Sequence, residues 1–574
     1  MATFVGLFLF IGFFLILILA VASSGDDEVT LKKDHVLHLK LSGPIYDRTT
    51  ENPFENFNFM TGETVDGIGL HDLLDEIDKA KKNEYVKGIF LDFAYLQCGY
   101  ASTKEIRSAL EDFKSDGKFI YAYSEGYTQK AYYLMSVADS IFLNPEGIME
   151  FMGIQGQVGF PLDMLAKIGV EPQVIRHGKF KSAVEPFLRN DMSEPNKIQT
   201  MAFISSIWDE VVAQVASSRG VSEEQLNNLI DQEALFLAAD ALSGGLVDQL
   251  AYRDEVHALL RKKLGQEEND DLRTISLSDL ENVKEKTSVS RDYIAVIYAQ
   301  GDIISGEGSE YQIGSGRISR AIRKARRDES VKAIVLRVNS PGGDALASDV
   351  ILREVELAKA EKPVIVSMGD LAASGGYYIS CKADRIFAEP NTITGSIGVF
   401  GVLMNPEELL NNKIGIHFDQ VMTNAHSDFG DPTRKLNEFE HAKILNFIEK
   451  IYADFIGHVA EGRSMEIADV DSIGQGRVWS GSDALEIGLV DEMGGLQDAI
   501  AFAAAEAGLE DYRMQSLPEQ KDAIQELVEQ LSGSMETRAL KSKLGPLYPY
   551  LEQMEQIQYM SGYQARMPFT IKLN

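Results

Sequence analysis

The chain has 574 residues, which is more than one compact core accommodates, so we expect at least two domains. Hydrophobic residues make up 45% and charged residues 25% of the sequence, as in ordinary globular proteins. The net charge of −32 argues against binding nucleic acid through a basic surface.

The N-terminal segment 3–22 (TFVGLFLFIGFFLILILAVA) contains no charged residue. Twenty such residues in a helix are about long enough to cross a bilayer, which predicts a transmembrane anchor. The alternative is a cleaved signal peptide, because small residues follow at 20–24. The apolar run is longer than a typical signal core and favours the anchor. No cationic residue precedes the run, so charge does not indicate its orientation.

The rest of the chain contains two copies of one pattern. Val86–Leu91 recurs as Val331–Leu336, 245 residues later, and further matches follow in the same register. Each copy alternates apolar strands with helices, which indicates an α/β fold with parallel-rich sheets packed by helices. We expect one domain over 35–268 and a second over 293–510, with a polar linker at 269–292 between them. A helical tail is predicted over 511–574.

In the second copy, an apolar strand leads into the small-residue segment 369–379 (GDLAASGGYYI). Ser374 in this turn precedes a predicted helix, and a hydroxyl exposed there is suited to nucleophilic attack. The structural alternative is that Ser374 only caps the helix. The first copy has Gln129 at this position.

A second motif, Asn339–Asp344 (NSPGGD), follows a predicted strand. Its two glycines allow a sharp turn whose N–H groups point at one place, as an oxyanion hole requires. A plain turn is the alternative for this motif alone. The first copy has 96–98 (LQC) in place of PGG, so it lacks this turn where it also lacks the serine.

The first copy carries a third motif, 176–187 (RHGKFKSAVEPF), with Lys181 where the second has Ser427. A lysine acts as a general base only when its amine is neutral, which requires the pKa to fall by roughly three units from about 10.4. Burial against apolar residues achieves this. A solvated surface lysine is the alternative, and Lys179 is a competing candidate for the base.

A fourth motif, 392–399 (TITGSIGV), could bind an extended peptide beside a strand. Ser396 and Gly398 are its candidate substrate-binding residues. The alternative is a close approach of two backbones, which the matching glycine of the first copy, Gly153, supports.

Together these motifs resemble the long form of signal peptide peptidase A, a membrane-anchored family of bacterial serine peptidases with a Clp/crotonase-type fold. The resemblance spans about 36–505 and includes FKSAVEPF and LAASGGY. It implies a Ser/Lys dyad with nucleophile Ser374 and general base Lys181, and an oxyanion-hole N–H from Gly343. Ser182 is implied as a helper that orients the lysine. The other candidate substrate-binding residues are Gly342 and Gly375.

The resemblance also implies a homotetramer that degrades signal-peptide remnants and similar hydrophobic peptides. It implies a single-pass protein of the bacterial inner membrane, with the catalytic domains on the extracytoplasmic side. We expect neither a metal nor another cofactor, since Cys98 and Cys381 form no metal-ligand spacing. A crotonase-like acyl-CoA hydratase or isomerase and an inactive membrane scaffold are the alternative functions. The base and the nucleophile lie in different copies, so neither half is expected to be active alone.

Overall fold

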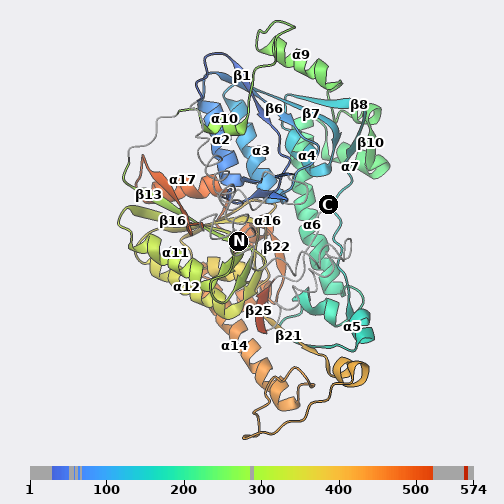
Figure 1. Ribbon diagram of the computed structural model, residues 1–574, viewed down its shortest axis with the longest axis vertical. Coiled ribbons are helices and arrows are strands. Elements are labelled where there is room, and N and C mark those ends of the chain that lie inside the picture. Colours follow the sequence, from blue (N-terminus) through green and yellow to red (C-terminus); the bar gives the residue numbers. More distant parts are fainter. Residues whose placement is uncertain are drawn as a thin grey trace, which may run out of the picture.

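The computed structural model describes residues 29–50, 57–58, 63–64, 67–284, 290–520 and 562–566. Two α/β domains lie next to each other, with the first at the top of Figure 1 and the second below it. Each domain has a largely parallel sheet covered by helices. The prediction of two tandem α/β domains is therefore confirmed.

In the first sheet the strands follow the order β12, β1, β6, β7, β8 and β10, and β11 also pairs with β8. Every pair is parallel except β10 with β8. The strands are β1 (His35–Leu39), β6 (Val86–Asp92), β7 (Phe119–Tyr127), β8 (Ser140–Glu150), β10 (Leu235–Leu237), β11 (Gln249–Leu250) and β12 (Thr274–Ile275).

The second sheet repeats this order as β24, β13, β16, β18, β20 and β22, while β19 joins β18 to β23. Its central strands are nearly continuous apolar runs, because helices cover both faces of a parallel sheet. The strands are β13 (Tyr293–Gln300), β16 (Val331–Ser340), β18 (Val364–Ala373), β19 (Arg385–Ala388), β20 (Ile393–Gly395), β22 (Val478–Ser480), β23 (Glu492–Met493) and β24 (Arg513–Leu517).

Helices at the surface of the domains bury one face. In α11 (Ser315–Arg327) the buried positions Ile318, Ala321, Ile322 and Ala325 follow the helical repeat. The other helices are α2 (Leu70–Lys82), α3 (Tyr100–Ser115), α4 (Gln129–Met135), α5 (Leu162–Ile168), α6 (Glu194–Arg219), α7 (Glu223–Glu233), α8 (Ala238–Ser243), α9 (Arg253–Lys263), α10 (Leu277–Glu281), α12 (Ala345–Lys359), α13 (Gly375–Ser380), α14 (Glu438–Arg463), α15 (Ile467–Ile473), α16 (Gly481–Glu486) and α17 (Leu496–Glu506).

Both predicted domain ends lie too early in the sequence. The expected linker contains β12, which pairs with β1 of the first sheet, and α10. The expected helical tail likewise begins with β24, which pairs with β13 of the second sheet. The tail's other described stretch, β25 (Gly562–Arg566), is also a strand. Each domain thus closes its sheet with a last strand beside its first.

A third sheet connects the two domains, in the order β15 (Gln312–Gly314), β14 (Asp302–Ile304), β17 (Gly342–Asp344), β25, β21 (Phe400–Asn405) and β9 (Glu171–Arg176). Strand β9 comes from the first half of the chain, and it pairs antiparallel with β21 along its whole length. The short strands β2 (Ile45–Tyr46) and β5 (Ile68–Gly69) pair with each other, as do β3 (Phe57–Asn58) and β4 (Glu63–Thr64).

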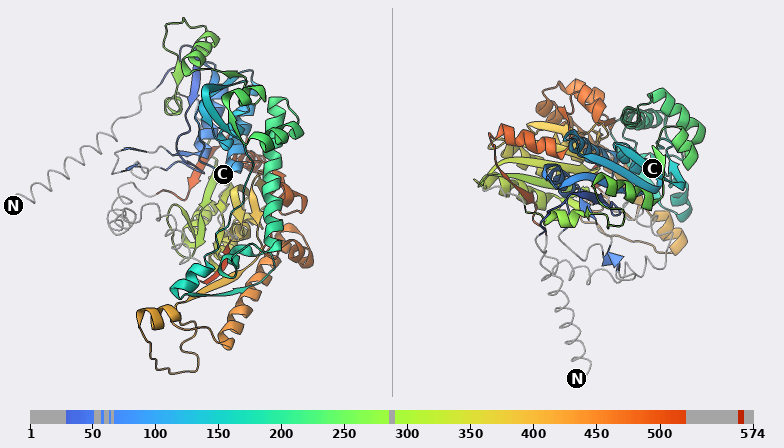
Figure 2. Two further views of the ribbon diagram at one scale, coloured as in Figure 1. Left: turned by 90° about the vertical axis from the view of Figure 1, so that its right-hand side faces the viewer. Right: turned by 90° about the horizontal axis from the view of Figure 1, so that it is seen from above.

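Helix α6 of the first domain runs along both domains (Figure 2, left). The Ser206 hydroxyl of this helix donates a hydrogen bond of 2.7 Å to Ser480 Oγ of β22. In the part of the chain that the structure describes, no helix is both long and apolar enough to cross a membrane. The predicted anchor at 3–22 lies outside the described residues.

Candidate active site

Ser374 lies at the sharp turn between β18 and α13. Its φ of 56° is a strained value for a residue with a side chain, and its N–H donates a hydrogen bond of 2.7 Å to the Gly395 carbonyl. The side chain does not cap α13, so the capping interpretation is wrong. The turn instead leaves the hydroxyl to other partners.

Lys181 reaches this turn from the other half of the chain. It follows β9 and immediately precedes a 3-10 helix over Ser182–Phe187. The pairing of β9 with β21 carries this segment across the domain boundary. Three residues of the third motif, Ala183, Val184 and Phe187, pack in one buried cluster with Phe400, as expected for an apolar site.

The Lys181 amine lies 2.8 Å from Ser374 Oγ, and both side chains are fully buried. Its other two partners belong to Ser396, whose carbonyl oxygen and hydroxyl each lie 3.0 Å from Nζ. A neutral amine has two N–H donors and one lone pair. If Ser396 accepts both N–H groups, the lone pair faces the Ser374 hydroxyl. The two copies therefore contribute to one site within a single chain.

Burial holds the pKa of the Lys181 amine well below its ordinary value. Desolvation is the cause of this shift, since in the described part of the chain no carboxylate forms an ion pair with Lys181. These surroundings favour the neutral amine that a general base requires.

Two glycines make room for the lysine side chain. A Cβ on Gly476, whose φ is +85°, would lie 2.6 Å from the Cα and Cβ of Lys181. A Cβ on Gly398 would lie 3.2 Å from Lys181 Cδ and 2.8 Å from the Gly476 backbone. Both Ser396 and Gly398, predicted to bind substrate, thus contact the lysine.

Lys179, the competing candidate for the base, and Ser182, the predicted helper, have partners other than the Lys181–Ser374 pair. Lys179 is exposed, and its amine lies over the Phe180 ring. The Ser182 hydroxyl accepts a hydrogen bond of 2.7 Å from Gln199 Nε2 instead of contacting the Lys181 amine. Ser396 holds the position expected of Ser182. The sequence offered no signal for this exchange, because Ser396 is 215 residues from Lys181.

The predicted turn at Gly342 and Gly343 is a short strand, β17, which lies next to the nucleophile turn. The register pairs Gly343 with Ile303 of β14 on one side and with Ala565 of β25 on the other. A Cβ on Gly342 would lie 2.6 Å from the Gly375 nitrogen. Gly342 and Gly375 are therefore close neighbours beside Ser374.

In the first domain, the turn that corresponds to the nucleophile turn is held by hydrogen bonds of a structural kind. Gln129, at the serine position, accepts hydrogen bonds of 2.9 Å from the N–H groups of Met152 and Gly153. Its amide donates to the Tyr100 hydroxyl over 2.9 Å. A buried glutamine with these partners fastens the turn and is not positioned to act as a nucleophile.

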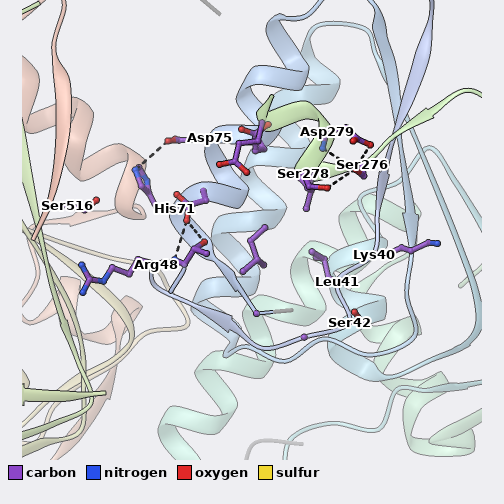
Figure 3. A pocket seen from close by; sticks show the side chains of 18 of the residues that line it. Lys40, Leu41, Ser42, Arg48, His71, Asp75, Ser276, Ser278, Asp279 and Ser516 are labelled. Carbon is purple, nitrogen blue, oxygen red and sulfur yellow. Dashed lines mark hydrogen bonds and ion pairs between the residues drawn. The ribbon is translucent and has the colours of Figure 1, made fainter. Parts of the chain in front are cut away.

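A separate cavity of about 1120 Å³ lies where the two domains meet near α2 and α10 (Figure 3). Its walls carry the charged groups of Arg48 and Asp75 and the imidazole of His71. Neither Ser374 nor Lys181 lines it. The dyad is thus buried away from this cavity.

The chain matches the model of the peptidase family S49 twice, over residues 112–267 and 356–510. Protease 4 of Haemophilus influenzae is 37% identical over 86% of this chain and 82% of its own length. A chloroplastic serine protease SPPA of Arabidopsis thaliana is 33% identical over 94% of this chain and 78% of its own. A putative signal peptide peptidase SppA of Enterococcus faecium is 38% identical over 33% of this chain and 55% of its own.

Proposed function

Because the chain belongs to peptidase family S49 and is a serine peptidase, we propose that Ser374 is its nucleophile and Lys181 its general base. The observation that carries this assignment is the 2.8 Å separation of Lys181 Nζ and Ser374 Oγ in a buried site. Family membership favours this reading over an acyl-CoA enzyme and over an inactive scaffold.

In the first half of the reaction, the neutral amine of Lys181 takes the hydroxyl proton of Ser374 while Oγ attacks the peptide carbonyl. Ser396 accepts hydrogen bonds from the amine and keeps its lone pair directed at the hydroxyl. Once protonated, Lys181 gives its proton to the leaving amine as the peptide bond breaks. Water then hydrolyses the acyl-enzyme: the same lysine takes the proton of the water and passes it to Ser374 Oγ as the ester bond breaks, which restores the neutral amine and the serine hydroxyl.

The N–H of Gly343 is proposed to bind the oxyanion, with Gly342 and Gly375 lining the substrate position. Their proximity supports this, since a Cβ on Gly342 would lie 2.6 Å from Gly375 N. Preorganised N–H donors are worth about 3–4 kcal/mol of transition-state stabilisation in acyl transfer. Ser182 acts indirectly, through Gln199, to fix the 3-10 helix that follows Lys181.

The proposed substrates are hydrophobic peptides in extended conformation, such as signal-peptide remnants. The similarity to a relative described as a putative signal peptide peptidase supports this class. Extended peptides fit a site flanked by strands, because they can add a strand beside β17. The fold proposed for both domains is of the Clp/crotonase type, supported by the repeated strand order of the two sheets.

We further propose a homotetramer held in the bacterial inner membrane by segment 3–22, with the domains on the extracytoplasmic side. The apolar sequence of the segment supports the anchor. The region between β21 and α14 supports assembly, because it projects from the body of the molecule (Figure 2, left) and exposes Ile414, Phe418 and Val421. Cross-linking of the full chain in membranes tests the tetramer.

The dyad is tested with Ser374→Ala and Lys181→Ala in the full chain, assayed on a fluorogenic signal-peptide substrate. Each is expected to lower kcat by at least about 10⁴-fold while the melting transition remains cooperative. Lys179→Ala is the matched control and should keep full activity. Mass spectrometry should detect a phosphonyl adduct on Ser374 after reaction with a serine-directed phosphonate. Full activity of Lys181→Ala would refute the assignment of the base.

A further inference from the structure

The strands β16 and β18, which lead to the proposed oxyanion glycine and to the nucleophile, lose their regular register just before the site. Val338 of β16 pairs with Met368 of β18, and the next matched pair is Ser340 with Ala372. One residue of β16 therefore lies opposite the three residues 369–371 of β18, which form a β-bulge. Because a bulge changes the direction of a strand, its shape decides where β18 places the serine.

Asn339 is the residue opposite this bulge, and its side chain takes the place of a backbone contact there. Its Oδ1 accepts a hydrogen bond of 3.2 Å from the N–H of Leu371, inside the bulge. Its carbonyl oxygen accepts another of 2.9 Å from the N–H of Gly301, directly after β13. The first copy has Ala94 at this position, so it lacks the amide where it also lacks the serine.

The next residue, Ser340, extends this arrangement to the glycines of β17. Its hydroxyl donates a hydrogen bond of 2.7 Å to the Gly301 carbonyl and accepts one of 3.1 Å from the Gly342 N–H. Gly343, the proposed oxyanion donor, follows directly. Two adjacent residues, Asn339 and Ser340, therefore connect the bulge before the nucleophile to the glycine strand.

A buried residue of the first domain determines which way the Asn339 amide faces. Asp47, directly after β2, accepts a hydrogen bond of 3.0 Å from Asn339 Nδ2 at one carboxylate oxygen. The other oxygen accepts one of 2.8 Å from Arg337 Nε. Because an ionised carboxylate only accepts, the NH2 group of the amide must face Asp47. The amide oxygen is then left for the N–H of Leu371.

Arg337 has a second acidic partner in the first domain, Glu105 of α3. Its Nη2 lies 2.6 Å from Glu105 Oε1, and the side chains of Glu105 and Asp47 are both 2% exposed. The other oxygen of Glu105 accepts a hydrogen bond from the Leu496 N–H. Among the described residues, the two acids thus match in charge, burial and cation, but of the two only Asp47 bonds to Asn339.

We propose that Asp47 and Asn339 are positioning residues for peptide hydrolysis. Asp47 orients the Asn339 amide, the amide holds the bulge between β16 and β18, and the bulge sets Gly343 relative to Ser374. This inference rests on the proposed function. The first domain then supplies the contact that aligns the oxyanion donor as well as the general base. Since neither residue is placed to touch substrate, their loss should lower kcat and leave KM nearly unchanged.

Exchange of the two side chains tests the inference in the full chain, with the fluorogenic signal peptide as substrate. Asp47→Asn opposes two NH2 groups, and Asn339→Asp opposes two carboxylates. Each single variant is expected to lower kcat by about 10- to 100-fold, as for a small displacement of reacting groups. The double variant restores one donor opposite one acceptor with the same net charge. Its kcat should return to within about threefold of the wild type, because the two sites are coupled.

Glu105→Gln is the matched control, because it removes the other carboxylate on Arg337 and leaves the Asn339 contact in place. It should lower the melting temperature about as much as Asp47→Asn while keeping most of kcat. Should Asp47→Asn fail to fold, Asn339→Ala tests the same contact with the Asp47–Arg337 pair intact, and it should melt cooperatively with a reduced kcat.

Three results would overturn the inference: wild-type kcat in a folded single variant, a double variant no more active than the single ones, or an equal loss of kcat in Glu105→Gln. The last would show that these acids only hold the domains together. In all three the wild type still cleaves the peptide and Ser374→Ala does not, so the proposed function stands. An active Ser374→Ala enzyme would instead contradict the proposed function.

Discussion

The carboxylate of Asp370 in β18 accepts a hydrogen bond of 2.7 Å from the Ser102 hydroxyl at the start of α3 in the first domain. It also accepts from the N–H groups of Ser102 and Gly99, over 2.9 and 3.2 Å. In the second domain the corresponding helix, α12, is capped by its own Asp344. The first domain has Gly99 there, so Asp370 supplies the missing cap across the interface.

Asp370 lies four residues before Ser374, so this contact is expected to position the nucleophile turn. Asp370→Ala should lower both the melting temperature and kcat, because hydrogen bonds to a charged group are worth about 1.5–3 kcal/mol. Asp370→Asn keeps one acceptor oxygen and should recover part of both. Thermal unfolding and steady-state kinetics measure this. An Asp370→Ala enzyme with wild-type kcat would show that the contact only joins the domains.

The lowered pKa of Lys181 predicts how activity depends on pH. The base works as the neutral amine, so kcat/KM should rise with pH through this pKa, well below the ordinary value for lysine. A pH–rate profile measures the acidic limb directly. An acidic limb that remained unchanged in a residually active Ser396→Ala enzyme would argue against Ser396 as a partner of the amine.

Lys181→Met should remove a pH dependence of stability. Between the lowered pKa and about 10.4 the unfolded chain binds one more proton at this residue, so wild-type stability rises with pH there. Below that window the full penalty for the buried charge remains. The free energy of unfolding of the Met variant should therefore exceed that of the wild type most at low pH. This difference should shrink by up to about 1.4 kcal/mol for each unit by which the pH rises within the window. Chemical denaturation at several pH values tests this.

Gly476→Ala is expected to displace the base. The new Cβ would lie 2.6 Å from Lys181, and the φ of +85° is itself unfavourable for alanine. We expect kcat to fall strongly, whereas the melting temperature should fall only a little. Gly488→Ala is the matched control, since Gly488 has a φ of +78° and open space where the Cβ would lie. Equal losses of activity in both variants would point to backbone strain alone.

Gln129→Ser should not create a second active site in the first domain. The change removes acceptors for the N–H groups of Met152 and Gly153, which costs about 1–3 kcal/mol for each buried donor left unpaired. Made in the Ser374→Ala background, it should restore no cleavage, since Lys181 serves the other domain. Recovered activity in that double variant would contradict a single shared site.

Separately expressed halves are expected to cleave nothing until mixed. The chain should be divided between residues 284 and 290, because β12 and α10 precede this point and pack with the first domain. Activity after mixing depends on re-forming the β9–β21 pairing. Activity of the second half alone would show that Lys181 is dispensable.

The two domain ends share a short sequence motif. Residues 271–277 (DLRTISL) and 511–517 (DYRMQSL) share Asp, Arg, Ser and Leu at the same spacing. These are the segments that form β12 and β24. Each segment is short and flanked by polar residues, so its pattern of apolar and polar residues does not by itself distinguish a strand from a linker. Only the pairing with β1 or β13 makes it the last strand of a sheet.

By itself the sequence determined the repeated α/β pattern and the chemistry divided between the copies, because strand and helix periods and residue types are local properties. The tertiary structure decided which groups meet. It buried Lys181 and left Lys179 exposed, replaced Ser182 by Ser396 at the amine, and brought Ala565 beside Gly342. These contacts join residues separated by up to about 220 positions. No local pattern encodes such contacts, because they depend on how the sheets pack.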